Sequence, residues 1–482
     1  MDTKKLRQKI LDLAIRGKLV PQDPNDEPAS VLLERIRAEK EQLIKEGKIK
    51  RSKKPAATDK SHYENVPFEI PENWCWTTLE NICSKIGSGS TPKGGIYSTE
   101  GILFFRSQNV YNNGVVLEDI KYISEEVHQS MIGTEVLSND LLLNITGGSL
   151  GRCAIVPYNI DRGNVSQHVC IIRPIIVKAE YLHLFILSLF FTRTMKITGS
   201  GREGLPKYNL ENMLLPLPPL SEQARIVDEV AKWNKIIDEI EDDKLELESH
   251  VKQIKSKILD LAISGKLVPQ DPNDEPAIEL LRRINPNFQP CDNSHYENLP
   301  QGWVKLRLGD VCSFERGITF PSSAKCTIKQ PGMIACIRTA NVQDNLELDD
   351  LWYVGNEYIK GNTEKLVRKN DIIMSSANSR ELVGKVSYVH DIPEQMTFGG
   401  FVLNIRANAG ILPFFLFLML RALYLKGYYL TIATQTTNIA NLNTKILSNI
   451  EVLLPPLTEQ KQIINSVTNI LTNIENITAE LS

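Results

Sequence analysis

The chain has 482 residues and a formal net charge of −3, and 42% of its residues are hydrophobic. This is an ordinary soluble composition with room for about three domains. The charge excludes a protein that coats nucleic acid electrostatically, though not one with local basic loops. The eight cysteines form no CxxC pair, which argues against a zinc site or disulfide framework and fits a reducing cytoplasm. The apolar runs at 181–191 and 412–425 are too short to cross a membrane.

The chain begins with a predicted amphipathic helix over residues 4–17, which Gly17 closes. A Pro-rich loop and a highly charged second helix follow. Residues 48–60, KIKRSKKPAATDK, then form a Lys-rich linker. We interpret this linker as a solubilising connection, with a phosphate-tracking arm as the alternative. Residues 1–60 are therefore assigned to a helical segment and a linker.

Two stretches of similar sequence, 61–220 and 294–457, are each predicted to form a globular α+β domain. Both begin with SHYEN, and both end at a Pro-Pro-Leu-(Ser/Thr)-Glu-Gln motif. Short β-branched runs between Gly/Asn turns predict a twisted antiparallel or mixed sheet, with helices late in each domain. The sequences diverge between their matched anchors, so one scaffold is used twice with different contents.

A single long helix is predicted between these domains, from Ser221 to about Leu267, with Gly265 as its C-terminal cap. Residues 221–293 are assigned to this helix and the linker after it, and residues 458–482 to a C-terminal helix. Apolar residues in both helices recur every 3.5 residues, the period of a coiled-coil seam. The predicted seam residues are Ile226, Val230, Trp233, Ile237, Ile240, Leu247, Val251, Ile254, Ile258, Leu261, Ile463, Val467, Ile470, Ile474 and Ile477.

The two ends of the chain copy the two halves of the long helix. Residues 9–29 recur at 257–277 with one change, from Arg16 to Ser264. The C-terminal segment instead copies the front of the helix, beginning at its Pro-Pro-Leu motif. We therefore expect a pseudo-twofold molecule in which both terminal helices pack antiparallel on the continuous one.

Matched positions in the two domains carry side chains suited to base edges. They are Arg106, Gln108 and Asn109 in the first domain and Arg338 and Asn341 in the second. Arginine pairs with guanine, and Asn or Gln pairs with adenine. A scaffold role is the alternative, in which the arginine pairs with a carboxylate and the asparagine caps a turn.

A glycine-rich loop, GSGSTPKGG, covers residues 87–95. It lacks the GxGxxG spacing and the following helix of a nucleotide site. Its polar residues, Ser88, Ser90, Thr91 and Lys93, face either a nucleic-acid ligand or solvent.

Residues that determine sequence specificity are expected where the two domains differ. Many of these positions are also compatible with an ordinary surface. The candidates are Asn144, Thr146, Ser149, Arg152, Arg202, Lys207, Arg316, Lys325, Ser376, Asn378, Arg380, Gln435, Thr436 and Asn438.

The chain contains no Walker lysine loop, HExxH, GxSxG or nuclease carboxylate cluster. NPNF at 285–288 resembles the Asp/Asn-Pro-Pro-aromatic motif of methyltransferases, but Asn287 replaces the second proline, so it is interpreted as a turn. We expect no catalytic, cofactor-binding or metal-binding residues. The side chains suited to base edges favour a non-catalytic subunit that reads DNA. Two alternatives are a methyltransferase–specificity fusion and a coiled-coil adaptor that binds protein.

Taken together, the paired domains, their Pro-Pro-Leu exits at 215–223 and 453–460 and the helix after each resemble a specificity subunit of a type I restriction-modification system. The resemblance covers essentially the whole chain, with a circularly permuted helical repeat. It implies two target-recognition domains that read the halves of an asymmetric site on double-stranded DNA, with the helices as a spacer. It also implies two methylation subunits that carry S-adenosylmethionine, and restriction subunits that use ATP and Mg²⁺.

Overall fold

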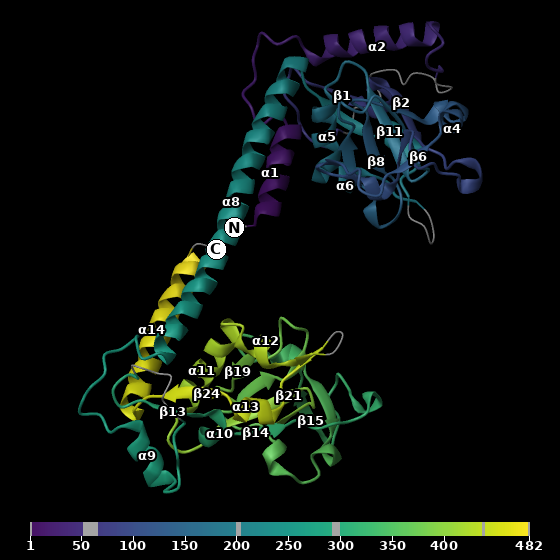
Figure 1. Cartoon of the computed structure of the whole chain (residues 1–482). Helices are drawn as coiled ribbons and strands as arrows, with labels where there is room; N and C mark the ends of the chain where they lie inside the picture. The colour runs from purple at the N-terminus through teal and green to yellow at the C-terminus, as the bar shows by residue number, and fades with distance from the viewer. Residues whose placement is uncertain (1, 52–65, 199–203, 292–298, 436–438, 481–482) are drawn as a thin grey trace. The chain divides into compact units, whose positions relative to one another are not determined.

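The computed structural model describes residues 2–51, 66–198, 204–291, 299–435 and 439–480. It divides into two compact units, Met1–Lys244 and Leu245–Ser482. Helix α8 (Leu220–Ile263) is 44 residues long and supplies residues to both units (Figure 1). The predicted long helix is thus confirmed, and Gly265 after it has a left-handed φ of 69°.

Unit 1 contains two four-stranded sheets. The first is antiparallel and consists of β2 (Cys83–Ser88), β11 (Val169–Pro174), β8 (Leu141–Asn144) and β9 (Cys153–Ile155), in that order. The second consists of β6 (Lys121–Ile123), β3 (Ile102–Phe105), β10 (Arg162–Val165) and β7 (Glu135–Leu137). Because β3 and β10 are parallel, the second sheet is mixed, as the sequence allowed.

The first sheet is buried on both faces. Leu141 and Leu143 belong to a core that also contains residues of helices α5 (Ala179–Leu187) and α6 (Leu189–Thr194). Leu142 points the other way, into a core shared with Phe105 of the second sheet. Successive strand residues face opposite sides, so a strand covered twice appears as a continuous apolar run.

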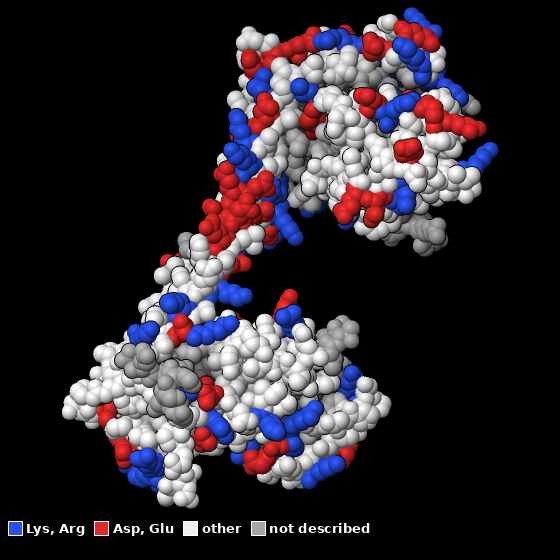
Figure 2. Space-filling view, in the orientation of Figure 1, with Lys and Arg blue, Asp and Glu red and all other residues white. Residues whose placement is uncertain are grey.

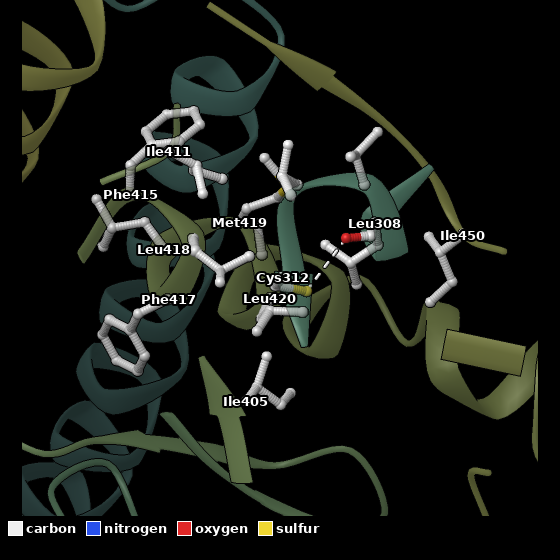
Figure 3. Packing of buried hydrophobic residues seen from close by; sticks show 14 of the residues in the cluster. Leu308, Cys312, Ile405, Ile411, Phe415, Phe417, Leu418, Met419, Leu420 and Ile450 are labelled. Carbon is white, nitrogen blue, oxygen red and sulfur yellow. Dashed lines mark hydrogen bonds between the residues drawn. The ribbon is translucent and has the colours of Figure 1, made fainter. Parts of the chain in front are cut away.

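Unit 2 repeats this design. Its antiparallel sheet consists of β14 (Cys312–Arg316), β21 (Val402–Ala407), β17 (Ile372–Ser375) and β19 (Val386–Tyr388). Its second sheet consists of β16 (Trp352–Gly355), β15 (Met333–Ile337) and β20 (Met396–Phe398), with β15 and β20 parallel. Helix α11 (Pro413–Leu425) covers the first sheet, and its Met419 and Leu420 lie beside Cys312 in the buried cluster (Figure 3).

Each unit ties its strands back to the helices through a two-stranded ribbon. In unit 1, β1 (Cys75–Thr78) pairs with β12 (Leu214–Leu217), and α8 begins directly after β12. In unit 2, β13 (Val304–Arg307) pairs with β24 (Glu451–Leu454), and α14 (Leu457–Glu480) follows. The Pro-Pro-Leu exits therefore mark the same ribbon-to-helix junction twice.

Helix α1 (Thr3–Ile15) runs antiparallel to the front of α8 in unit 1. The Arg7 guanidinium donates to Asn234 Oδ1 at 3.0 Å and to Asp238 Oδ1 at 2.6 Å. Further along the chain, Gln22 Nε2 donates to Glu222 Oε1 at 2.7 Å. As the residue numbers rise along the N-terminal segment, those of their partners on α8 fall, so the two segments run antiparallel.

Helix α14 pairs with the back of α8 in unit 2 in the same sense. Lys255 Nζ lies 3.2 Å from Glu475 Oε1, and Gln270 Nε2 lies 3.1 Å from Glu459 Oε1. In both units the helix pair is therefore antiparallel, as predicted. None of the helices built from the described residues is long and apolar enough to span a membrane.

The predicted seam residues of the helix pairs are not all buried to the same depth. Ile226, Val230, Ile237, Ile258, Ile463 and Val467 are buried, and Ile240, Leu247, Val251, Leu261, Ile470 and Ile474 are partly buried. Trp233, Ile254 and Ile477 are instead 38%, 49% and 57% exposed. At the helix ends, Leu259 and Ala262 are buried beside Ile258, because α8 packs there on the globular core of unit 2 as well as on α14.

The Glu-Gln pair of the Pro-Pro-Leu-(Ser/Thr)-Glu-Gln motif is buried and forms a junction. In unit 1, Glu222 accepts from Trp74 Nε1 at 2.9 Å and from Gln22, and it is 1% exposed. The neighbouring Gln223 Oε1 accepts from the N–H of Lys178, just before α5. One motif therefore joins the loop after α1, the first ribbon, α8 and α5.

Unit 2 builds the same junction from Glu459, Trp303 and Gln270. Trp303 Nε1 donates to Glu459 Oε2 at 2.8 Å. A Cβ on Gly265 would lie 2.5 Å from the Pro300 ring and 3.2 Å from Trp303. Only glycine allows the helix end to approach the indole this closely with a positive φ.

Burial raises the pKa of both junction glutamates above the usual value of 4.5, against the lowering effect of their hydrogen bonds. The native state then keeps protons that the unfolded state releases. These groups therefore stabilise fully below pH 4.5, and their contribution is lost as pH rises through the folded pKa. For the double variant Glu222→Gln/Glu459→Gln, we expect the free energy of unfolding to fall less steeply with pH than in the wild type. Urea unfolding at a series of pH values above 4.5 measures the free energy of unfolding, with Glu239→Gln, at an exposed position, as the control. If the free energies of the double variant and the wild type fall in parallel with pH, the expectation is wrong.

Candidate nucleic-acid interface

In unit 1 the strands that precede the predicted DNA-binding loops end along one side of the sheets. The C-terminal end of β2 pairs with the start of β11, Ser88 opposite Cys170, and β8 ends beside the same point. The end of β3 pairs with the end of β10, Phe105 opposite Val165. We call this side the strand-end edge. It brings loops that are distant in sequence into one neighbourhood.

The loop after β2 crosses very close to the connection between β10 and β11. A Cβ on Gly89 would lie 1.9 Å from the carbonyl oxygen of Val165. In unit 2, a Cβ on Gly317 would lie 2.0 Å from the carbonyl oxygen of Gly399. Since neither position can accept a side chain, both units hold this loop against the edge by the same close approach.

His168 occupies the strand-end edge of unit 1, one residue before β11. Its Nδ1 lies 2.8 Å from Thr146 Oγ1, and the neighbouring Gln167 is exposed. Thr146 also forms a β-bridge with Gly204, which forms a second bridge with Thr198. Thr146 was predicted from sequence, whereas Gln167 and His168 were not.

Phe401 takes the corresponding position in unit 2, one residue before β21. The carbonyls of His168 and Phe401 accept equivalent backbone bonds, from the N–H groups of Ile145 and Ser376, both at 3.0 Å. The Phe401 side chain is 62% exposed. An apolar side chain in one unit and an imidazole in the other would favour different base edges, because aromatic and apolar groups contact the thymine methyl.

A small sheet completes the strand-end edge of unit 2. It consists of β18 (Ala377–Asn378), β23 (Ala440–Asn441) and β22 (Thr434–Gln435). Asn378 pairs with Ala440, which pairs with Gln435. The predicted residues Asn378 and Gln435 are thereby brought together. Arg316 Nε makes a long contact of 3.4 Å to the carbonyl of Gly400, the residue before Phe401.

Most of the remaining candidates are accessible. The exposed ones are Ser88, Ser90, Thr91, Lys93, Gln108, Arg152, Lys207, Arg316, Lys325, Arg380 and Gln435. The partly buried ones are Arg106, Thr146, Ser149, Arg338 and Asn378. Arg202, Thr436 and Asn438 lie outside the described residues.

Asn109 and Asn341 have the scaffold role that was the alternative. Each is buried, and its Oδ1 accepts from the backbone N–H of the arginine three residues earlier, Arg106 or Arg338. Asn109 Nδ2 donates to the carbonyls of Val116 at 3.0 Å and Glu118 at 3.3 Å, and Asn341 Nδ2 donates to the Asp350 carbonyl at 3.1 Å. Their amide groups close a turn in each unit and are not presented to a ligand.

Arg338 is also partly committed inside the protein. It forms an ion pair with Asp350, and its guanidinium lies 4.9 Å from the ring centre of Trp352. Lys325 Nζ covers the same indole at 4.3 Å. In unit 1, Arg106 donates to the carbonyl of Asp119. These contacts orient the cations by ordinary ion-pair and cation–π forces.

Asn144 and Ser376 are likewise buried, at 0% and 5% exposure. Asn144 Nδ2 donates to the Ser107 carbonyl at 2.8 Å, which ties the end of β8 to the turn after β3. Ser376 Oγ donates to the Phe401 carbonyl at 3.0 Å. Both side chains are buried under the strand-end edge and bond to the protein backbone. Their positions therefore do not support the prediction that they contact DNA.

Within the described ranges, no group of three or more His, Cys, Asp or Glu side chains could hold a metal ion. Burial raises the pKa of the Cys170 thiol to about 12, so this thiol is protonated at neutral pH and a weak nucleophile. The arrangement offers hydrogen-bonding loops at both edges, with a partly buried imidazole in unit 1 and an exposed aromatic ring in unit 2, and such edges can recognise a surface.

A repeated sheet domain with different loops on the same edge defines a protein with two recognition modules. Sequence comparison agrees with this class. Residues 71–249 and 300–482 match the type I restriction modification DNA specificity domain. This match covers most of the chain, so the chain belongs to the type I restriction-modification DNA specificity family and its role is DNA recognition.

Two curated relatives come from Escherichia coli. The chain is 31% identical to the type I restriction enzyme EcoAI specificity subunit over 450 residues, which cover 77% of this chain and 72% of the relative. It is 32% identical to the EcoEI specificity subunit over 378 residues, which cover 64% of this chain and 61% of the relative.

Solved structures share the fold. One, from a study of complex assembly and conformational transition of the type I R-M system, has a TM-score of 0.55 at 20% identity and covers 86% of this chain and 94% of its own. The HsdS subunit from Thermoanaerobacter tengcongensis has a TM-score of 0.50 at 20% identity, with coverage of 86% and 93%. The expected two-domain α+β fold with a long helix is thereby confirmed.

Proposed function

We propose that this chain is the non-catalytic targeting subunit of a cytoplasmic type I restriction-modification complex. Each unit reads one half of an asymmetric, bipartite site on double-stranded DNA with its strand-end edge. The observation that carries the proposal is the repeated edge: one framework presents His168 in unit 1 and the exposed Phe401 in unit 2. Such a pair suits two different half-sites.

The partners follow from the same proposal. Two methylation subunits bind the chain, carry S-adenosylmethionine and methylate adenine, and restriction subunits supply ATP- and Mg²⁺-dependent cleavage. The relatives named as restriction enzyme specificity subunits support this assignment. Co-expression with a candidate methylation subunit, followed by genome-wide mapping of methylated adenine, tests it. One asymmetric motif with a fixed gap is expected, whereas a complex that assembles without methylating DNA would favour the adaptor alternative.

The proposal treats the continuous helix α8 as a ruler between the half-sites. A four-residue insertion next to Lys244 lengthens a helix by about 6 Å, since the rise is about 1.5 Å per residue. Base pairs stack about 3.4 Å apart. We therefore expect the methylated motif to keep both half-sites while its gap grows by about one to two base pairs. The substitution Lys244→Ala, which leaves the length unchanged, is the control; an unaltered gap in the insertion variant would refute the ruler.

A further inference from the structure

A groove of about 630 Å³ lies in unit 1 between α1 and α6. It is built from one side of the N-terminal helix and the first apolar residues of α6. Its lining residues are Asp2, Lys4, Lys5, Gln8, Lys9, Asp12, Arg16, Leu189, Phe190 and Arg193. Five of these residues are cationic and two are carboxylates.

Unit 2 has a groove of about 500 Å³ at the corresponding place. It lies between the back part of α8 and the end of α11, and its lining residues are Ser249, Lys252, Gln253, Ser256, Lys257, Asp260, Leu425 and Lys426. Lys257 and Asp260 are the repeat copies of Lys9 and Asp12, and Lys252 stands five residues before Lys257, as Lys4 stands before Lys9. The same positions of the repeat therefore line a groove twice, although the opposite walls differ.

The cations in both grooves exceed what the nearby carboxylates neutralise. Asp12 Oδ1 already accepts from Arg16 Nε at 2.8 Å, and Asp260 forms an ion pair with Lys426. Lys4, Lys9 and Lys252 are exposed and form no ion pair with another described residue. These three ammonium groups remain available to an anionic ligand.

The helix pair of unit 1 is electrostatically two-sided. Figure 2 shows Lys and Arg atoms along its α1 side and a dense group of Asp and Glu atoms on its α8 side. The acidic residues in this stretch of α8 are Asp238, Glu239, Glu241, Asp242 and Asp243, of which Asp238 and Glu241 form ion pairs with Arg7 of α1. A polyanion is repelled from the α8 side and attracted to the α1 side, where the groove opens.

A short stretch of chain connects the wall of the groove in unit 1 to the strand-end edge. Thr198, four residues after the end of helix α6, forms a β-bridge with Gly204, which also bridges Thr146. Thr198 lies five positions after Arg193, a span of at most about 17 Å. A duplex has a phosphate every ~3.4 Å on each strand, so one that continues from the edge towards α6 would offer several phosphates within this span.

We propose that both grooves hold the phosphate backbone of duplex DNA outside the half-site that each strand-end edge reads. This inference rests on the proposed function and adds a sequence-independent contact that is the same in both units, because its lysines are repeated while the reading loops differ. Lysine contacts to phosphates position a protein on DNA without carrying sequence information.

The test is the variant Lys4→Gln/Lys9→Gln/Lys252→Gln/Lys257→Gln of the full chain, since glutamine keeps helix propensity and removes charge. Binding to a duplex with the mapped motif and to a random duplex is measured from 50 to 200 mM salt. Loss of the three unpaired lysines alone reduces the slope of log K against log salt by roughly 2.7, and Lys257, which pairs with Asp260 at 3.9 Å, adds up to about 0.9. The affinity drop between 50 and 200 mM salt then becomes smaller by a factor on the order of 40 to 150. The control is Lys18→Gln/Lys266→Gln, a repeated pair outside both grooves, which should bind as the wild type does.

The outcomes separate the possibilities. A reduced slope on both duplexes, with the preference for the motif unchanged, supports the proposal. A wild-type slope in the groove variant overturns it while the motif preference still supports the proposed function. A wild-type slope combined with loss of the co-purifying methylation subunit assigns the grooves to protein docking and also overturns it. If the wild-type chain does not prefer its motif, the proposed function fails, and this inference fails with it.

Discussion

Replacing Trp303 by alanine is expected to lower the free energy of unfolding by about 3–5 kcal/mol, the usual cost of truncating a buried indole. Trp303 is 7% exposed and packs against the C-terminal cap of α8. The loss also leaves the buried Glu459 without its indole donor, which had held Oε2 at 2.8 Å. The expected result is a large shift of the urea midpoint monitored by circular dichroism.

Two further tryptophan variants separate the contribution of the hydrogen bond from that of the buried ring. Trp303→Phe keeps an aromatic ring but no donor, so about 1–3 kcal/mol should be lost through the unsatisfied carboxylate. Trp233→Ala removes an indole that is already 38% exposed and should cost clearly less than Trp303→Ala. Equal costs for Trp233→Ala and Trp303→Ala would show that the buried junction does not stabilise the unit.

Removing the Asp371 carboxylate should also cost about 3–5 kcal/mol, as breaking a buried ion pair usually does. Asp371 is 3% exposed and accepts from Arg406 Nε at 2.9 Å, from Asn404 Nδ2 at 2.6 Å and from the backbone N–H of Arg368 at 2.8 Å. In Asp371→Ala these donors lose their acceptor in a buried site. Chemical unfolding measures the difference.

The control is Glu394→Ala, which breaks the ion pair between Glu394 and Lys329. The Lys329 side chain is 52% exposed, so this pair should contribute far less to stability than the Asp371 pair and should weaken with salt. A loss of less than 1 kcal/mol in Asp371→Ala would contradict the account. The same ion pair recurs in unit 1, where Arg173 Nε lies 2.7 Å from Asp140 Oδ1.

The architecture was predictable because its signals are local or repeated. The length of α8 and its glycine cap follow from periodicity and turn residues, and the repeats predicted antiparallel helix pairs. The sequence left the sheets antiparallel or mixed, and the structure shows an antiparallel sheet and a mixed sheet in each unit. The exposure of Trp233 could not be predicted in this way. A 3.5-residue period reports which residues share a helix face, whereas the depth of burial depends on the neighbouring elements.

The candidate interface was predictable only in part. Residue type selected Asn109, Asn144 and Asn341, but an amide that suits adenine also suits a backbone turn, and the fold uses all three internally. His168 and Phe401 were missed because neither side chain is prominent among base-reading types. Their signal was positional: each directly precedes a matched strand, at a point where the two domains differ.

The near-identity of residues 9–29 and 257–277 bears on how such a chain can evolve. Each copy contributes one side of the buried glutamate–tryptophan junction, through Gln22 or Gln270. Recombination between gene segments that encode the two copies would exchange the first globular domain and the following helix as a cassette. Both new joins would fall inside sequence that already fits its neighbours. A lineage could thus gain a new specificity in one genetic event, without passing through poorly folded intermediates.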